Sequence, residues 1–244
     1  MCARSISPTP RSSTEPPVIP VIRSDAELVA VCKPAGMPVQ PDPTGDPDLL
    51  SLLRAQIGAK ELWLIHRIDR PVSGVVLFGR SPQAAEALSE QFRERTVQKQ
   101  YWAIVEGRMA TTMELQAVLR RDPSKHKAVL AASGKGAPGR LHVSPLRMGE
   151  RYTLVEVRPE GGAFHQIRAQ LGAAGWPIKG DVKYGARRGE KDRSIHLHAR
   201  SIKFTHPVTR MELHCEAAVP LSGLWPLFTG DAGPAAHGRG PEAT

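Results

Sequence analysis

The sequence predicts an α+β fold in which a large, mixed, mostly antiparallel sheet carries a few packed helices. Two observations predict it. Most apolar segments are short runs typical of strands, and only three segments carry helix signals. The chain shows no internal repeat and no sign of a second domain. One domain over residues 18–229 is therefore expected.

The strand predictions rest on short apolar runs bounded by turn residues. The first run ends at Lys33-Pro34-Ala35-Gly36, where proline and glycine favour a turn. A polar loop over residues 66–74 separates the second run from the third. The predicted strands are 27–32, 62–65, 75–78, 101–105, 152–157 and 202–204.

Three helices are predicted, over residues 47–57, 82–95 and 164–174. The second has the clearest start, because Ser81 can cap it and Pro82 suits the first helical position. The third ends at the stop signal Gly175. The residues expected to face inward from the second and third helices are Ala84, Ala85, Leu88, Phe92, Ile167 and Leu171.

The two ends of the chain are predicted to be disordered. Residues 1–17 are rich in Ser, Thr and Pro, and residues 230–244 in Gly, Pro and Ala, so neither end can bury enough apolar surface to fold. The N-terminus lacks the apolar stretch of a signal peptide, and no run is long enough to span a membrane. Three scattered cysteines, Cys2, Cys32 and Cys215, form no disulfide pattern, so a cytoplasmic location is expected.

The charge balance points to a class of partner. The chain has 33 Lys and Arg against 24 Asp and Glu, a formal net charge of +9, with a pI near 9.8. Such a surplus favours a polyanion, because each neutralised phosphate releases condensed counterions. A basic enzyme with no nucleic-acid role fits the charge equally well.

Several common catalytic signatures are missing from the sequence. There is no GxxxxGK[ST] loop, strand-linked GxGxxG, HExxH or GxSxG elbow, so nucleotide-driven, hydride-transfer, zinc-peptidase and serine-hydrolase chemistry lack support. His196 and His198 would share one face of a strand, but further ligands are not evident beside them. Hydrogen-bonding histidines are the simpler interpretation, and we expect neither a metal nor a cofactor.

The loop over residues 66–74 is the first concentration of reactive side chains. It places Asp69 close to two arginines, Arg67 and Arg70, between two apolar strands. Nearby positive charge keeps a carboxylate ionised, which suits a nucleophile or an electrostatic anchor. Taken alone, Asp69 is more often a turn residue that caps its own backbone.

The second concentration follows a glycine pair, Gly161 and Gly162, that lets the chain turn into a helix. His165 and Arg168 then lie three positions apart on one helical face. An arginine at this place can hold a carboxylate of a neighbouring loop in a bidentate fork. A solvated surface arginine is the alternative.

Five segments, in order, resemble motifs of the RluA family of pseudouridine synthases. Residues 66–77, HRIDRPVSGVVL, are similar to its signature loop HRLD-x-x-[ST]-SG. The other segments are LVAVCKPAGMPV (28–39), KQYWAIVEG (99–107), FHQIR with GDVKYG (164–168 and 180–185), and HLHA with FTHP (196–199 and 204–207).

The resemblance implies an enzyme that isomerises uridine to pseudouridine in RNA. The C1′–N1 bond breaks, the base rotates and rejoins through C5, and no redox or hydrolytic step requires a cofactor. Asp69 matches the essential aspartate, which acts as a nucleophile at the sugar or base, or as a base at C2′. Tyr101 matches the tyrosine that stacks on the target base and could also assist loss of the C5 proton. Arg168 is expected to pair with Asp69 and orient it.

The resemblance also implies the substrate contacts. Arg67 would fill the gap left by the extruded uridine. The remaining expected contacts are His66, Arg70, Ser73, Gly74, His165, Gln166 and Ile167. The expected partner is a stem-loop of ribosomal or transfer RNA, bound by a monomer that lacks the N-terminal S4 domain of some relatives. Candidate phosphate contacts are Arg120, Arg121, Lys125, Lys127, Lys135, Arg187 and Arg188, with a solvated surface as the alternative.

The sequence departs from the family pattern at three places. Ile68 replaces Leu, Val72 stands where Thr is frequent, and Ala163 replaces a basic residue, with loss of one phosphate contact. Two alternative functions remain open. One is a catalytically silent RNA-binding module, and the other is a hydrolytic glycosidase that acts on nucleosides through Asp69.

Overall fold

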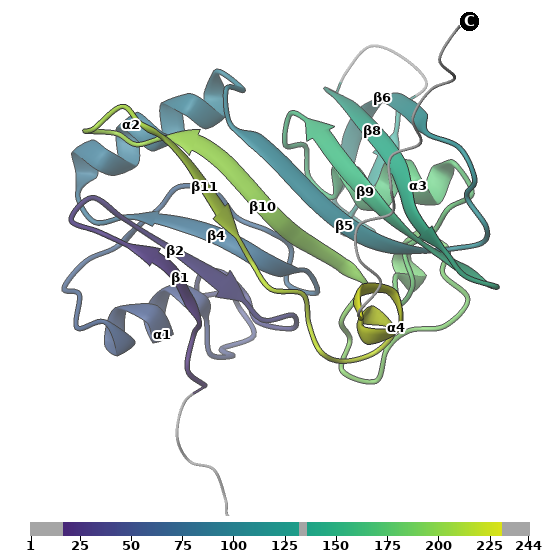
Figure 1. Ribbon diagram of the computed structural model, residues 1–244, viewed down its shortest axis with the longest axis horizontal. Helices are drawn as coiled ribbons and strands as arrows, with labels where there is room; N and C mark the ends of the chain where they lie inside the picture. The colour runs from purple at the N-terminus through teal and green to yellow at the C-terminus, as the bar shows by residue number, and fades with distance from the viewer. Residues whose placement is uncertain (1–16, 132–135, 231–244) are drawn as a thin grey trace, which may run out of the picture.

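The computed structural model describes residues 17–131 and 136–230 (Figure 1). The ends predicted to be disordered, 1–17 and 230–244, lie outside the described residues except for Pro17 and Gly230. The strands are β1 (Val21–Ser24), β2 (Leu28–Lys33), β3 (Trp63–Leu64), β4 (Ser73–Gly79), β5 (Gln98–Glu106), β6 (Met113–Asp122), β7 (Lys127–Leu130), β8 (Ala137–Met148), β9 (Tyr152–Glu160), β10 (Leu197–Thr205) and β11 (Glu212–Glu216). The helices are α1 (Leu49–Gln56), α2 (Pro82–Arg93), α3 (Gln166–Ala173), α4 (Trp225–Thr229) and the 3-10 helix η1 (Val182–Tyr184).

All of these strands belong to one sheet, with the order β1-β2-β4-β10-β5-β9-β8-β6-β7. β3 adds to β4, and β11 adds to β10. Only β4 and β10 pair in parallel among the described strands, through His198 opposite Ser73 and Ala199 opposite Gly74. The predicted α+β class with a large, mostly antiparallel sheet is confirmed. No helix of the described residues is long and apolar enough to cross a membrane.

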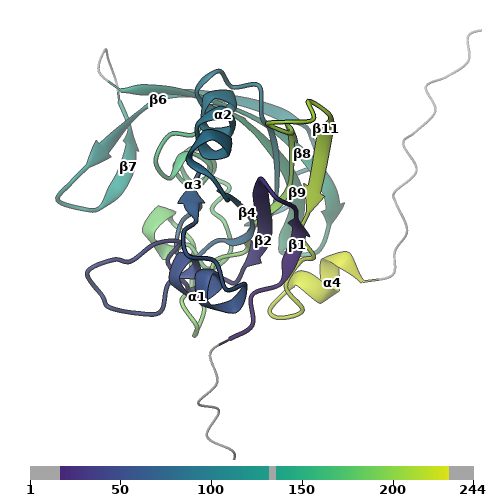
Figure 2. The same cartoon turned by 90° about the vertical axis from the view of Figure 1, so that its left-hand side faces the viewer.

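Helices cover both faces of the N-terminal half of the sheet (Figures 1 and 2). Val29 and Val31 of β2 pack in one cluster with Leu49 and Leu53 of α1. The alternate residues of β2 pack in a second cluster that contains Leu88 of α2. A strand buried on both faces reads as a continuous apolar run, which explains why the sequence marked β2 so clearly.

The larger of these clusters continues into the C-terminal half of the sheet. It passes through Ala103 of β5 and Leu197 of β10 to Val155 of β9 and Leu171 of α3. α3 therefore packs on the same core as the strands that precede and follow the loop 66–72. This shared core fixes the position of the two halves relative to each other.

The predicted helices form, with small changes at their ends. Ser81 caps α2 by accepting a hydrogen bond from the Ala84 amide at 3.1 Å, and Pro82 occupies its first turn, as predicted. α3 begins two residues later than predicted, because His165 has a left-handed backbone with φ of 51°. Of the described strands, β1, β6, β7, β8 and β11 were not predicted. β1 and β7 have only four residues each, and Pro138, Gly139 and Pro145 interrupt the strand pattern of β8.

His198 is a buried polar residue of β10 that ties this strand to β4. Its Nε2 lies 3.3 Å from the Ala217 carbonyl and donates to it, so its Nδ1 accepts from the Ser73 hydroxyl at 2.8 Å. His196 uses its own Nε2 to accept from the Leu224 amide at 3.0 Å. The two histidines therefore hydrogen-bond separately, and the described residues hold no cluster of three or more candidate metal ligands.

His198 predicts acid sensitivity of the fold. Burial lowers its pKa from 6.5 to about 4, so the unfolded chain takes up this proton first as the pH falls. Its contribution to stability is complete above about pH 6.5 and is lost as the pH falls toward 4. The free energy of unfolding should fall when the pH is lowered from 7 to 5. In His198→Gln this fall should be about 2 kcal/mol smaller than in the wild type, because the variant lacks the buried imidazole. Urea titrations at both pH values measure it, and equal drops would contradict it.

Candidate active site

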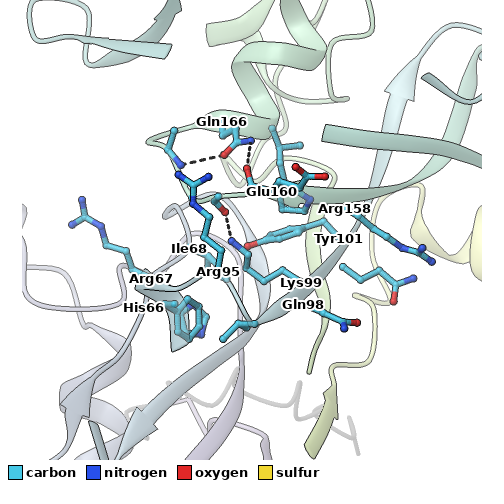
Figure 3. Close-up of a pocket in the computed structure, with 18 of the residues that line it drawn as sticks. His66, Arg67, Ile68, Arg95, Gln98, Lys99, Tyr101, Arg158, Glu160 and Gln166 are labelled. Carbon is cyan, nitrogen blue, oxygen red and sulfur yellow. Dashed lines mark hydrogen bonds between the residues drawn. The ribbon is translucent and has the colours of Figure 1, made fainter. Parts of the chain in front are cut away.

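An open groove of about 1540 Å³ lies where the two halves of the sheet meet (Figure 3). The loop 66–72 borders it on one side, the end of α2 and the start of β5 on another, and residues 158–168 on a third. Tyr101 lies across its centre, while Arg67 and Arg158 extend outward on opposite sides in Figure 3. Loop residues, strand residues and a helix start therefore face one shared space.

A buried lysine holds the loop that carries Asp69. The Lys33 ammonium donates to the carbonyls of Pro34 at 2.9 Å, Met37 at 2.8 Å and Arg70 at 3.1 Å. The Gly36 amide donates to the same Arg70 carbonyl at 2.8 Å. Burial lowers the pKa of Lys33 to about 7, and the charge of Asp69 acts in the opposite direction. The turn 33–37 is thus fastened to the loop one residue beyond Asp69.

Asp69 is held by one arginine from α3. Arg168 Nη1 donates to Asp69 Oδ2 at 3.0 Å. The Asp69 side chain keeps 25% of its surface exposed, whereas that of Arg168 keeps 6%. His165 Nε2 lies 3.6 Å from the same Oδ2. Arg168 and His165 both lie next to Oδ2. Oδ1 accepts no hydrogen bond from the described residues, so Oδ1 is the oxygen available to a ligand.

A second carboxylate, Asp181, was not assigned a role from the sequence. Arg168 binds it with two hydrogen bonds, Nε to Oδ2 at 2.7 Å and Nη2 to Oδ1 at 2.9 Å. The bidentate fork expected for Arg168 therefore goes to Asp181, and Asp69 receives a single bond. Burial alone would lower the pKa of Arg168, but its bonds to Asp181 and the charges of both carboxylates raise it. The signal was present, because Asp181 belongs to the GDVKYG segment.

Tyr101 of β5 borders the groove as predicted. Burial raises the pKa of its phenol above the usual value, and the negative charge of Asp69 raises it further. The phenol therefore keeps its proton at neutral pH. Ile167 of α3 and Ile68 of the loop contribute apolar surface to the same groove. An apolar wall, a protonated phenol and a carboxylate face one another there.

Two other predicted contacts border the groove but are already engaged. His66 accepts a hydrogen bond from the Leu77 amide at Nε2, 3.1 Å away, and its ring stacks on Phe92. Burial, then the charge of Lys99, lowers the pKa of His66 to about 3, so the ring is neutral. Gln166 bonds the Arg140 and Glu160 carbonyls and the Ala163 amide. Both side chains fix the walls of the groove.

Arg70, which was expected to contact the substrate, does not border the groove. Its guanidinium turns toward residues 36–46, where it donates to the Gly36 carbonyl at 2.8 Å and pairs with Asp46. Asp69 therefore takes its cation from Arg168 and not from its neighbour in the sequence. Arg70 donates to three acceptors in the loop 36–46, namely the Gly36 carbonyl, the Thr44 hydroxyl and the Asp46 carboxylate, and to none on Asp69.

Ser73 and Gly74 are likewise absent from the groove, because both are structural residues of β4. Ser73 donates to His198, as described above. Gly74 has φ of 119°, and a Cβ added to it would lie 2.3 Å from the Ala199 carbonyl oxygen. Only glycine allows β4 and β10 to approach so closely. The Ser-Gly pair of the signature loop therefore joins the two halves of the sheet.

Two of the basic residues that border the groove, Arg67 and Arg168, were predicted from the sequence, and the other five were not. The basic residues that border it are Arg67, Arg93, Arg95, Lys99, Arg158, Arg168 and Lys203, against the acidic residues Asp69, Glu114 and Glu160. Within the described ranges, Arg67, Arg95, Lys99 and Lys203 form no ion pair. Burial, then the charge of Arg95, lowers the pKa of Lys99 to about 8. The groove thus holds unneutralised positive charge that an anion would stabilise.

The phosphate contacts predicted from the sequence lie elsewhere. Lys135 lies outside the described residues, and none of the other six candidates borders the groove. Arg121 instead packs over Phe164, with its guanidinium carbon 4.9 Å from the ring centre. The sequence patterns of the segments that carry the groove cations do not show which side chains face the groove.

The paired carboxylate behind Arg168 predicts a large effect on stability. Asp181→Ala should lower the free energy of unfolding by roughly 3–5 kcal/mol, because it leaves Arg168 buried with only one bond to Asp69. Denaturant titration with circular dichroism measures this change. Glu86→Ala, which removes an exposed partner of Arg93, is the matched control and should leave the midpoint nearly unchanged. Equal midpoints for the two variants would refute the role of Asp181.

The sequence matches a known family and several curated relatives. The model of the family described as RNA pseudouridylate synthase matches residues 27–173. A tRNA pseudouridine synthase C of Haemophilus ducreyi is 34% identical over 219 residues, which cover 81% of this chain and 89% of that protein. A ribosomal large subunit pseudouridine synthase C of Vibrio vulnificus is 33% identical, with 81% and 64% covered. An uncharacterised RNA pseudouridine synthase of Chloroflexus aurantiacus is 37% identical, with 81% and 60% covered.

The chain thus spans less than two thirds of the Vibrio and Chloroflexus proteins. Two solved structures are similar. Human RNA pseudouridylate synthase domain containing 4 has a TM-score of 0.66 and 26% identity, with 83% of this chain and 89% of that chain covered. Domain containing 1 shares the fold, with a TM-score of 0.73, 22% identity, and 88% and 89% covered. The chain therefore belongs to the RNA pseudouridylate synthase family, and its resemblance to the RluA members is confirmed.

Proposed function

We propose that this protein is an RNA pseudouridine synthase that isomerises specific uridines in ribosomal or transfer RNA. The observation that carries the proposal is the Asp69 carboxylate, held by the buried Arg168 beside Tyr101 in a basic groove. The Vibrio relative, at 33% identity, is named for ribosomal RNA, and the Haemophilus relative, at 34% identity, is named for transfer RNA. Both classes of RNA are therefore proposed as substrates and tested below.

Asp69 is the proposed catalytic residue, and Oδ1 is its proposed reactive oxygen. Arg168 donates to Oδ2, so the arginine stabilises the charge and leaves the other oxygen facing the groove. This arrangement suits attack on the nucleotide as well as removal of the C2′ proton, and both routes return the carboxylate unchanged. The isomerisation is redox-neutral and needs no water or nucleoside triphosphate, so we propose that it proceeds without a cofactor.

Tyr101 is proposed to stack on the extruded base. Its raised pKa supports a neutral phenol that packs against the base and donates a hydrogen bond, in preference to a phenolate that takes the C5 proton. Arg67 is exposed at the rim of the groove, and its proposed role is to fill the space left by the uridine. Ile167, Gln166, His165 and His66 are proposed to shape the base pocket around these groups.

The proposal also covers the location of the enzyme, its oligomeric state and the shape of its RNA substrate. The scattered cysteines suit the reducing conditions of the cytoplasm, so we propose a cytoplasmic enzyme. Asp69, Tyr101 and Arg168 all come from one chain, so a monomer supplies every proposed catalytic group. The proposed substrate is a stem-loop, whose bases unstack at lower cost than those of a regular helix.

Asp69→Asn should abolish isomerisation and leave RNA affinity within about twofold, because the amide can neither attack nor accept a proton while the basic groove persists. The reaction replaces the C5 hydrogen of uridine, so tritium release from RNA labelled at C5 measures it. Ribosomal and transfer RNA that lack pseudouridine are the two substrates. Asp46→Asn, in the loop that holds Arg70, is the matched control and should retain activity.

Each other outcome of this experiment identifies a different function. Wild-type protein that binds both RNAs without releasing tritium would indicate a silent RNA-binding module. Release of free uracil would indicate a glycosidase. Turnover by Asp69→Asn would remove Asp69 from the catalytic role. Pseudouridine mapping after deletion of the gene then identifies the modified position.

RNA affinity should depend steeply on salt, and the groove cations should carry that dependence. Each phosphate contact adds about −0.7 to −0.9 to the slope of log affinity against log salt. Lys203→Gln and Arg95→Asn should each reduce the slope by about that amount. Arg187→Gln, at an exposed position outside the groove, is the control and should leave the slope unchanged. Filter binding measures the affinity at roughly 50 to 300 mM salt, the range in which phosphate contacts change affinity strongly. If only Arg187→Gln reduced the salt slope, the RNA would bind outside the groove.

A further inference from the structure

The side chains behind Asp69 form a hydrogen-bonded chain that the proposed mechanism does not use. It runs from the Ala128 amide through the Tyr184 hydroxyl to His165, whose far nitrogen faces Asp69 Oδ2. Tyr184 belongs to η1 and His165 directly precedes α3. We propose that Tyr184 is a positioning residue, which fixes the proton of His165 on Nε2 so that Asp69 faces a hydrogen-bond donor.

The direction of each hydrogen bond follows from the donors available. The Ala128 amide can only donate, so the Tyr184 oxygen accepts from it at 2.7 Å. The hydroxyl proton then needs an acceptor, and His165 Nδ1 at 2.8 Å is the one that the described residues offer. The reverse arrangement would leave the hydroxyl proton without a partner among the described residues. His165 Nδ1 therefore accepts, and its proton lies on Nε2.

The charge states support this assignment. Burial lowers the pKa of His165 to about 4, against the opposing effect of Asp69, so the ring is neutral and carries one proton. Burial raises the pKa of Tyr184 to about 12, so its hydroxyl keeps the proton that it donates. The 3.6 Å between His165 Nε2 and Asp69 Oδ2 is slightly beyond a hydrogen bond. Catalytic hydrogen bonds commonly tighten in the complex with substrate.

Tyr184 also supports the other group that holds Asp69. The guanidinium carbon of Arg168 lies 5.1 Å from the centre of its ring, within the range of a cation–π contact. The backbone of η1 is pressed against α3, since a Cβ added to Gly172 would lie 2.5 Å from the Tyr184 carbonyl oxygen. The ring is therefore rigidly placed, and its hydroxyl can be removed without removing the ring.

The first test measures the tautomer itself and needs no RNA. In the wild-type protein, nitrogen NMR of the histidine side chains should show His165 with a bare Nδ1 and a protonated Nε2. Tyr184→Phe should move protons onto Nδ1, because the donor to that nitrogen is gone. Tyr152→Phe, a tyrosine that packs elsewhere in the core, is the matched control and should change nothing. A proton on Nδ1 in the wild type, or an unchanged tautomer in Tyr184→Phe, would overturn the proposal.

The second test rests on the proposed function and separates a proton effect from a backbone effect. Tyr184→Phe should lower kcat by about tenfold with KM for RNA within about twofold. His165→Gln should retain more activity than His165→Asn, because the glutamine amide reaches the position of Nε2. A backbone role predicts the opposite order, since Asn tolerates the left-handed conformation better.

A double-mutant cycle completes the kinetic test. Tyr184→Phe should have almost no further effect in the His165→Gln background, where no tautomer is left to fix. Independent losses, or an Asn variant as active as the Gln variant, would refute the role of the Nε2 proton. If wild-type protein isomerises neither RNA, the proposed function fails, and the NMR experiment alone decides the role of Tyr184.

Discussion

The interaction on which the site depends is the burial of Arg168 between two carboxylates. A buried guanidinium is tolerated only when acceptors satisfy its N–H groups, and Asp181 and Asp69 supply three of them. Asp181 is almost fully buried and Asp69 is partly exposed, so the arginine is anchored on one side and presented on the other. The position of the Asp69 carboxylate in the groove therefore depends on Arg168 of α3 and on Asp181, which directly precedes η1. Both residues are far from Asp69 in the sequence.

The groove exists because β10 joins two halves of one sheet, with β4 on one side of it and β5 on the other. One half contributes the loop with Asp69, and the other contributes α3 with Arg168. Their contact requires close approach of β4 and β10 at Gly74, and the shared core keeps both halves in register. Cations without acidic partners gather along this junction. A polyanion that lies across the groove would neutralise them while its extruded base reaches Asp69.

Sequence patterns were informative where one local cause determines the structure. Ser81 and Pro82 specify the start of α2 by their own chemistry, and the strand 27–32 is apolar because both of its faces are covered. The pairing of Asp69 with Arg168 followed from the family motifs. The partners of Arg70 and the role of Asp181 did not, since both depend on how distant loops pack. Lys99 and Lys203 of the groove were missed for the same reason, because only the assembled sheet shows which of its faces the side chains of β5 and β10 occupy.

The parallel pairing of β4 with β10 joins residues 125 positions apart, through Ser73 and His198. A ribosome makes β4 early and β10 near the end of the domain. The signature loop therefore lacks β10, and Asp69 lacks Arg168, until the chain has been extended past residues 205 and 168 respectively. Closing so long a loop is slow relative to local folding. The nascent chain consequently completes the β4–β10 junction and the surroundings of Asp69 only late in the synthesis of the domain.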